Sequence, residues 1–259
     1  PAKDKQPRRF PQVLSDGKPL VGDASGRLAL AKWIADKKNP LTARVMVNRV
    51  WRWHFGRGLV ATTDNFGLQG EKPSHPELLD WLAGWFMDNG WSLKKLNTLI
   101  LNSATYRMST TTSPAALKAD PNNVLLSRAP LRRLEAEPLR DSLLELGGLL
   151  DKKIGGYVWT FENYKLVFNH TSEDATTYES NRRALYLPVI RNHVYDLFEL
   201  FDFPDPGTVN GNRADSTIAP QALYLMNSPL VLRATEAMAK DLLADKNLTN
   251  AQRAERLYT

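Results

Sequence analysis

Cysteine is absent from this sequence of 259 residues. Its absence excludes disulfide bonds, thiolate metal sites, thiol nucleophiles and covalent haem attachment within the chain. Long apolar runs are missing as well, because no stretch of roughly eighteen apolar residues occurs, and the sequence therefore predicts no membrane-spanning helix. What is present, 42% hydrophobic and 24% charged residues, is typical of a globular protein that can bury a large core.

Well-known catalytic motifs are also missing. The sequence has no Gly-x-Ser-x-Gly elbow, no phosphate-binding glycine loop, and no His-x-x-x-His pair among its four histidines. His193 with Asp196, and His75 with Glu77, have spacings that metal ligands can show, but surface and helix-capping roles are the simpler interpretation. We therefore predict no metal site, and the spacing of residues identifies no reaction.

The excess of positive charge is small. The 34 lysines and arginines face 28 acidic residues, which leaves a net charge of +6 at pH 7. Only the N-terminal segment KDKQPRR is locally basic, so nucleic-acid binding through this arm is kept as an alternative function. Charges of both signs scattered along the rest of the chain favour a solvated surface with internal ion pairs instead.

Prolines and glycines are frequent in residues 1–24, which predicts an extended arm or linker. Residues 25–259 are predicted to form a single, mainly α-helical domain, because apolar residues recur at helical spacing after serine and proline start signals. The predicted helices lie within residues 23–40, 41–55, 74–90, 92–107, 132–151, 193–201 and 219–243, the last range being two helices broken at Ser228-Pro229. Ser25, Ser74 and Ser92 are the predicted N-caps, and Pro76 and Pro138 are predicted to lie in the first turns of their helices. Because the chain begins at Pro1 and ends in AQRAERLYT, which is typical of an unfinished helix, we expect a fragment of a larger protein.

A β-rich insertion is predicted at about residues 155–190. Segment 157–169 alternates bulky aromatic residues with others, as a hairpin does, and segment 183–190 has the composition of a strand. Pro188 favours an edge position for that strand, since proline cannot donate a ladder hydrogen bond. The predicted fold class is thus mainly α, a single helical domain with a small β insertion made of a hairpin plus an edge strand.

The second predicted helix contains the segment VNRVWRWHFGRGLV, which is rich in both polar and aromatic side chains. A projection at about 100° per residue gives one apolar arc, whose members are Ala43, Met46, Val47, Val50, Trp51, Trp53 and Phe55. The projection directs Arg49 and Arg52 toward water. Arg44 and His54 project from within the arc, and Asn48 lies at its edge. These three side chains require polar partners.

Two further helices carry polar groups on faces that should be dry. If the helix that begins at Ser92 continues to its predicted end, Arg107 aligns with Ile100, and Asn97 lies beside them. On a later helix, Glu135 lies close to a leucine stripe. That stripe consists of Leu139, Leu143, Leu146 and Leu150. Unpaired burial costs about 1–3 kcal/mol for a neutral group and several kcal/mol for an ion, so we predict one arginine-rich polar network, with Glu135 as a carboxylate for an arginine.

The segment GTVNGNRADSTIAPQAL is a further candidate. Ser216 or Thr217 is placed to cap the helix that Pro220 begins, and Arg213 and Gln221 stand on either side of that start. The free N–H groups of a helix start favour an anion. Simple capping is the plainer interpretation.

Several phrases of the sequence together resemble a known family. The phrases are NPLTARVMVNRVWRWHFGRGLV, PSHPELLDWLAGWFMDNGWSLKKLNTLILNSATYR, RRLEAEPLRDSLL, RRALYLPV and STIAPQALYLMNSPLV. They are similar to the C-terminal domain of unknown function of large exported planctomycete proteins, which also carry a second uncharacterised domain and a cytochrome c-type module. The resemblance implies a periplasmic or cell-surface location, and partners among the other domains of the same polypeptide. Haem c is then expected on a separate linked module, with no cofactor in this chain.

These observations predict a module that recognises or helps to process an exported anionic or polyhydroxylated substrate, in particular a polysaccharide. The candidate ligand-binding residues are Arg44, Asn48, Trp51, His54, Arg107, Glu135, Arg213 and Gln221. Arginine forks suit carboxylates and sulfates, and an indole ring of Trp51 or Trp53 suits a sugar face. Whether the chain is an enzyme stays open. The main alternative is a non-catalytic scaffold, in which the network only locks the helices together and the surface docks neighbouring domains.

Overall fold

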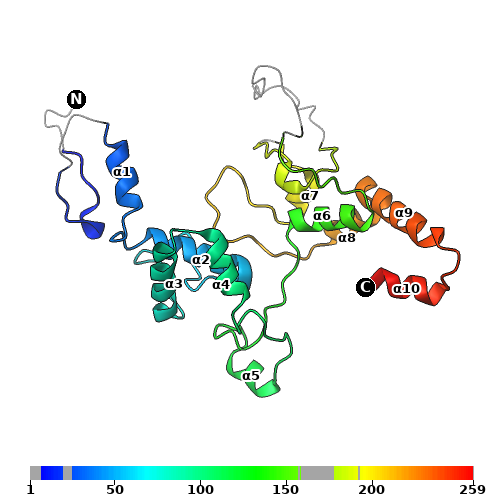
Figure 1. Cartoon of the computed structure of the whole chain (residues 1–259), viewed down its shortest axis with the longest axis horizontal. Helices are drawn as coiled ribbons and strands as arrows, with labels where there is room; N and C mark the ends of the chain where they lie inside the picture. Colours follow the sequence, from blue (N-terminus) through cyan, green and yellow to red (C-terminus); the bar gives the residue numbers. More distant parts are fainter. Residues whose placement is uncertain (1–6, 20–24, 157, 159–177, 192, 259) are drawn as a thin grey trace. The chain divides into compact units, whose positions relative to one another are not determined.

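The computed structural model describes residues 7–19, 25–156, 158, 178–191 and 193–258, and it is mainly helical (Figure 1). Within the described residues no sheet is formed, and strand-like pairing is limited to two isolated bridges, Arg9 with Pro19 and Asp151 with Arg182. The mainly α prediction is confirmed. Among these residues no helix is both long enough and apolar enough to cross a membrane.

Contacts between residues divide the chain into two compact units, Pro1–Arg132 and Arg133–Thr259. Each unit is described by itself below. The predicted boundary between an arm at 1–24 and a domain at 25–259 stays a prediction.

Unit 1 is built on three helices that pack around one apolar core (Figure 1). Its elements are η1 (Gln12–Leu14), α1 (Arg27–Ile34), α2 (Thr42–Phe55), α3 (Pro76–Asp88), α4 (Leu93–Leu101) and α5 (Pro114–Ala119). The core side chains come from α2, α3 and α4, and include Val47, Val50, Leu79, Leu82, Phe86, Leu96 and Ile100. They recur at the helical spacing seen in the sequence, so the apolar pattern alone positions these helices.

Local start and stop signals explain most helix ends in unit 1. Pro76 occupies the first turn of α3, and the Ser92 side chain caps α4 by accepting a hydrogen bond from the Lys95 N–H. Gly56 ends α2 with a positive φ of 79°, a conformation that glycine adopts without strain. Two capping predictions fail: the N-cap position of α1 is Gly26 rather than Ser25, and that of α3 is His75 rather than Ser74.

The stretch after α4 differs from its prediction. Helix α4 ends at Leu101, short of the predicted end at residue 107. The Ser103 hydroxyl donates to the Ile100 carbonyl, which satisfies that carbonyl in a turn instead of a further helical turn. The serine- and threonine-rich segment that follows leads into α5, a short helix that was not among the predicted ones and that Ser113 caps through the Ala116 N–H.

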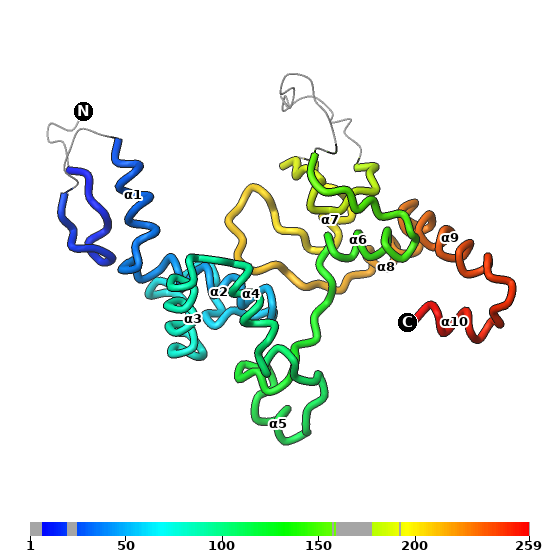
Figure 2. Tube along the Cα trace, in the orientation of Figure 1, coloured from blue at the N-terminus to red at the C-terminus, as the bar shows by residue number. Residues whose placement is uncertain are grey.

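Unit 2 packs four helices around an aromatic-rich core. Its elements are α6 (Ala136–Leu146), η3 (Ala184–Tyr186), α7 (Asp196–Leu200), α8 (Ala219–Asn227), α9 (Pro229–Ala244) and α10 (Asn250–Tyr258). Pro138 lies in the first turn of α6, and Ser228-Pro229 separates α8 from α9, both as predicted. The Cα trace in Figure 2 shows the chain reversing after α9 to form α10.

The edge strand predicted at 183–190 is wrong. Residues Ala184–Tyr186 form a 3-10 turn, and the buried side chains of this segment are Ala184, Leu187 and Ile190. Burial at every third residue is the period of a 3-10 turn, whereas a strand buries every second residue. The hairpin predicted at 157–169 lies, except for Val158, outside the described residues.

Candidate functional site

Arg44 forms an ion pair on the surface of unit 1. Its Nε donates to Asp80 Oδ1 at 2.7 Å, and its Nη1 donates to the Pro40 carbonyl at 2.7 Å. The hydrogen bond from Arg44 holds the pKa of Asp80 below its usual value. The side chain of Arg44 is 37% exposed and borders a groove of ≈ 440 Å³ walled by Pro40, Pro73, Pro76 and Phe66. Arg44 is therefore accessible, but it is already paired.

Asn48 is completely buried, and both ends of its amide bind one residue. Its Nδ2 donates to the Val60 carbonyl at 2.9 Å, and its Oδ1 accepts from the Val60 N–H at 2.8 Å. Gly58 makes this close approach feasible, because a Cβ there would lie 2.7 Å from Asn48 Nδ2 and 2.5 Å from the Val60 carbonyl oxygen. Asn48 thus fastens the segment after α2 to the helix.

The buried face of α2 is turned relative to the predicted arc. Arg52 is buried although the projection directed it to water, and Trp53 is 55% exposed although the projection buried it. Trp51 packs against Phe55, with ring centroids 4.3 Å apart. The projection chose the buried face of α2 from side-chain polarity alone. In the folded helix the side that carries Arg52 is buried, and the side that carries Trp53 is exposed.

His54 finds a partner on a second helix. Its Nε2 lies 2.6 Å from Asn97 Oδ1, and its ring meets Tyr106 edge-on at 5.5 Å. The expectation that polar groups on dry faces find each other is confirmed for this pair. The predicted alignment of Arg107 with Ile100 is wrong, because α4 ends before it; Arg107 is exposed and donates to the Asn102 carbonyl at 3.2 Å.

In unit 2, Arg213 is bound by two glutamates. Its Nη1 and Nη2 donate to the two oxygens of Glu137 at 2.5 and 2.7 Å, and Glu135 Oε2 lies 3.3 Å from Nη1. Glu137 raises the pKa of Arg213, and the guanidinium lies over the Phe203 ring at 5.3 Å. Glu135 does hold an arginine, as predicted, but the stronger partner, Glu137, was not anticipated.

Gln221 is buried and satisfies the start of α8. Its Oε1 accepts from the Ile218 N–H at 3.2 Å and from Arg133 Nη1 at 2.9 Å, and its Nε2 donates to the Leu200 carbonyl at 3.0 Å. The prediction that Ser216 or Thr217 caps α8 is wrong, because the N-cap residue is Ile218 and its N–H donates to Gln221. The Ser216 hydroxyl donates to Asp202 instead. No anion is needed there.

The prediction of one arginine-rich network is wrong for unit 1, because Arg44 and Arg107 are not buried together and each is bonded separately. The ligand-binding candidates fall into two sets. Arg44, Asn48, Trp51, His54 and Arg107 belong to unit 1, and Glu135, Arg213 and Gln221 belong to unit 2. Within each unit the polar members bind backbone groups or side chains of that same unit. Their roles toward a ligand stay predictions.

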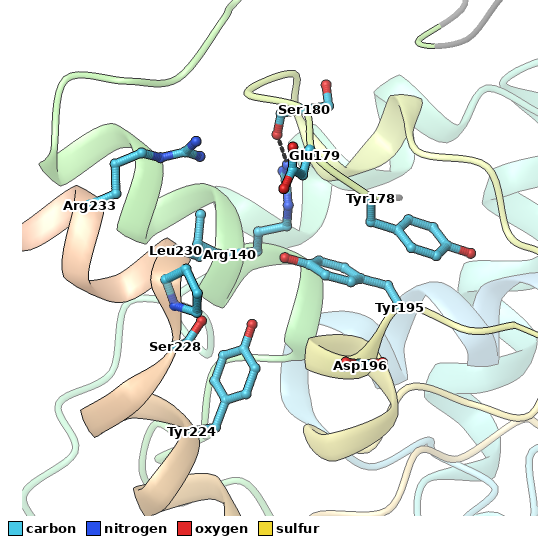
Figure 3. Close-up of a pocket in the computed structure, with 11 residues that line it drawn as sticks. Arg140, Tyr178, Glu179, Ser180, Tyr195, Asp196, Tyr224, Ser228, Leu230 and Arg233 are labelled. Atoms are coloured by element: carbon cyan, nitrogen blue, oxygen red, sulfur yellow. Dashed lines mark hydrogen bonds between the residues drawn. The ribbon is translucent and has the colours of Figure 1, made fainter. Parts of the chain in front are cut away.

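A pocket of ≈ 400 Å³ in unit 2 gathers polar residues that sequence reasoning missed (Figure 3). It is lined by Arg140, Tyr178, Glu179, Ser180, Tyr195, Asp196, Tyr224, Ser228, Pro229, Leu230 and Arg233. These residues come from α6, α7, α8, α9 and the segment before α7. Its volume lies within the range of small-molecule sites, about 300–1,000 Å³.

Arg140 is the buried cation beside this pocket, with only 1% of its side chain exposed. Its guanidinium donates to the carbonyls of Ser180 and Arg182 and to Asp141 Oδ1, the last at 3.2 Å. The buried stripe of α6 is Ala136, Arg140 and Leu144, instead of the predicted leucine stripe. The four-residue spacing was the available signal, because it aligns an arginine with two apolar residues.

Three tyrosines form the aromatic wall of the pocket. Tyr195 stacks on Tyr178 with centroids 5.0 Å apart and an angle of 20° between the rings. Burial, and then the neighbouring Tyr224, raise the pKa of Tyr195 to about 12, and the Arg140 charge opposes this only in part. The Tyr195 phenol is therefore a neutral hydrogen-bond donor at ordinary pH. Figure 3 shows the hydroxyls of Tyr195 and Tyr224 pointing toward the same space beside Ser228.

The start of α9 also opens into the pocket. Ser228 is the N-cap residue, 6% exposed, yet its side chain makes no capping hydrogen bond. At the rim, Arg233 Nη2 donates to Asn181 Oδ1 at 3.0 Å, and the carboxylates of Glu179 and Asp196 are exposed. The pocket thus places hydroxyl donors and a buried cation at its floor, with charges of both signs at its rim.

The chemistry of these groups suits recognition. Within the described part of the chain, no group of three or more His, Asp or Glu side chains is arranged to hold a metal ion. Tyrosine and serine hydroxyls, arginines and a helix start are donors for the oxygens of a bound molecule.

Comparison with known proteins places the chain in a family. No curated protein and no solved structure matches the chain. A family model described as a protein of unknown function (DUF1553) matches residues 26–259, which include helices of both units. The chain therefore belongs to the DUF1553 family of proteins of unknown function.

Proposed function

We propose that this chain is a recognition module that binds a polyhydroxylated ligand, the sugar units of a polysaccharide, in the tyrosine-lined pocket of unit 2. The observation that carries the proposal is the ≈ 400 Å³ pocket itself, with Arg140 and the Tyr195 and Tyr224 hydroxyls at one place. Tyrosine supplies both a flat apolar face and a donor, the combination that a sugar ring with its hydroxyls requires.

The setting of the proposal follows from the resemblance in the sequence. We place the module outside the cytoplasm, in a multidomain planctomycete protein whose separate cytochrome c-type module carries haem. The partners would be other domains of that polypeptide. Electrons, if the substrate is oxidised, would pass to the linked cytochrome.

A screen of short oligosaccharides by thermal shift tests the proposal. The parent chain and Tyr195→Phe are compared, since the substitution keeps the ring and removes one donor. We expect a stabilising oligosaccharide in the parent and a weaker shift in the variant. Arg44→Ala, in unit 1, is the matched control and should retain the full shift. A shift that depends on Arg44 and is indifferent to Tyr195 would contradict the proposal.

The second candidate function is a non-catalytic scaffold. Two observations favour it: the predicted polar residues are bonded within their own units, and α8 exposes Leu223 and Met226. Exposed apolar side chains on one helix suit the docking of a neighbouring domain. Replacement of both by Ser would weaken such docking and leave oligosaccharide binding unchanged, which separates the two functions.

A further inference from the structure

The first turn of α9 has the groups of an anion site. This helix is sixteen residues long, and its N–H groups at the start carry a partial positive charge. A serine at the N-cap normally accepts a hydrogen bond from one of these N–H groups. Ser228 does not, and Pro229 has no N–H to offer, so the first-turn donors after it have no side-chain cap.

Ser228 supplies an independent second observation. Its side chain is more than nine-tenths buried and lines the pocket, yet its hydroxyl makes no hydrogen bond within the described part of the chain. The hydroxyl faces the open space of the pocket rather than closed protein, so a water or a ligand there can complete its hydrogen bonds. One bound group could therefore accept hydrogen bonds from both the Ser228 hydroxyl and the first-turn N–H groups of α9.

Two arginines and two carboxylates line the pocket, and they differ in depth. Arg140 is a buried residue of the pocket wall, and Arg233 lies on α9 five residues after the N-cap. Glu179 and Asp196 also line the pocket, but both are exposed at its rim, where water screens them. Arg233 is exposed at the rim as well, so the rim carries charges of both signs, and the buried positive charge is that of Arg140, which Asp141 neutralises in part.

We propose that the start of α9 is the subsite for an oxyanion of the ligand, the carboxylate of a uronic sugar or the sulfate of a sulfated one. The inference rests on the proposed function and adds the substrate class: an acidic polysaccharide. The oxyanion accepts from the Ser228 hydroxyl and from the first-turn N–H groups of α9, and Tyr224 and Tyr195 donate to neighbouring sugar oxygens.

Titration calorimetry of the full chain with three short oligosaccharides tests the inference. One is built of uronic sugars, one is sulfated, and one is their neutral counterpart. We expect one acidic ligand to bind at least tenfold more tightly than the neutral one, and the preference to shrink as salt rises. Whichever acidic ligand binds more tightly identifies the oxyanion.

Ser228→Ala and Ser92→Ala form a matched pair of variants. Ser228→Ala should weaken the acidic ligand about tenfold to a hundredfold, the loss expected for a hydrogen bond to a charged group, and leave the neutral one unchanged. Because the Ser228 side chain caps nothing, its loss should leave the melting temperature nearly unchanged. Ser92→Ala removes a real cap and should lower the melting temperature without changing any affinity.

The possible outcomes test the oxyanion subsite and the sugar-binding function separately. Equal binding of acidic and neutral oligosaccharides that depends on Tyr195 would overturn the oxyanion subsite and leave the sugar pocket standing. Binding of none of the three would overturn both. An acidic preference that survives Ser228→Ala unchanged would overturn the subsite at α9.

Discussion

Arg44 in unit 1 and Arg140 in unit 2 both lie in line with apolar residues of their helices, yet they end in opposite environments. Arg44 lies in the first turn of α2, and its side chain reaches outward to Asp80. Arg140 lies in the middle of α6 and is buried against the carbonyls of Ser180 and Arg182. Position along the helix, as well as its face, thus decides whether an arginine becomes a surface ion pair or a buried anchor.

The largest expected effect is that of Arg140→Met. The variant leaves the partly buried carbonyls of Ser180 and Arg182 without this donor, while Asp141 keeps only the Ala184 N–H, and breaking a buried charged cluster of this kind costs about 3–5 kcal/mol. Urea unfolding followed by tyrosine fluorescence should show unit 2 destabilised. A loss of unfolding free energy below about 1 kcal/mol lies in the range of a surface ion pair. Such a result would contradict the conclusion that Arg140 is a buried anchor and Arg44 a surface pair.

Asn48→Ala should have the next largest effect, and in unit 1. The variant leaves both the carbonyl and the N–H of Val60 buried without a partner, which costs about 2–4 kcal/mol. Chemical unfolding followed by tryptophan fluorescence measures it. Asn97→Ala is a control, because its partner His54 is only half buried and water can replace the lost amide. An equal loss of stability in the two variants would contradict the conclusion that Asn48 fastens the segment after α2 to the helix.

Alkaline pH should affect unit 2 through Tyr195. Its pKa is 10.0 in an unfolded chain and about 12 when folded, so the neutral phenol is favoured by folding. The stability from this shift is fully present below pH 10 and is lost as pH rises from 10 toward 12, up to about 2–3 kcal/mol. Melting temperatures across this range should fall less steeply for Tyr195→Phe, and identical slopes would refute the assignment.

Arg44→Ala should have the smallest effect. Arg44 lowers the pKa of Asp80, so the pair stabilises the fold above pH 4 and loses this contribution as pH falls through the lowered pKa. Because the Asp80 side chain is 59% exposed, the pair is worth less than about 1 kcal/mol. The difference in melting temperature between parent and variant should shrink in acid to the small contribution of the hydrogen bond from Arg44 to the Pro40 carbonyl. A persistent large difference would show that Arg44 supports more than this pair.

Local signals in the sequence predicted where helices begin and end better than which face of each helix is buried. Ser92, Pro76 and Ser228-Pro229 marked helix ends correctly, because caps and prolines act within one turn. The buried side of α2 was misjudged at Arg52 and Trp53, since only the packed structure decides how far a face extends.

The candidate site was harder to predict than the helices. His54 and Glu135 did find partners, as their position on dry faces indicated. The spacing of Ala136, Arg140 and Leu144 in α6 indicated that Arg140 is buried, but the more regular leucine pattern was chosen as the buried stripe. Tyr195 and Tyr224 gave no signal, because their proximity depends on how α7 and α8 fold against α6, which no local pattern encodes.

Hydrogen exchange of the 259-residue chain, with and without an acidic oligosaccharide, tests most directly that unit 2 holds the ligand site. We predict slower exchange at the first turn of α9 and around Tyr195, with α2, α3 and α4 unchanged. Slower exchange confined to α2 and its Arg44 groove, with unit 2 unaffected, would contradict the account.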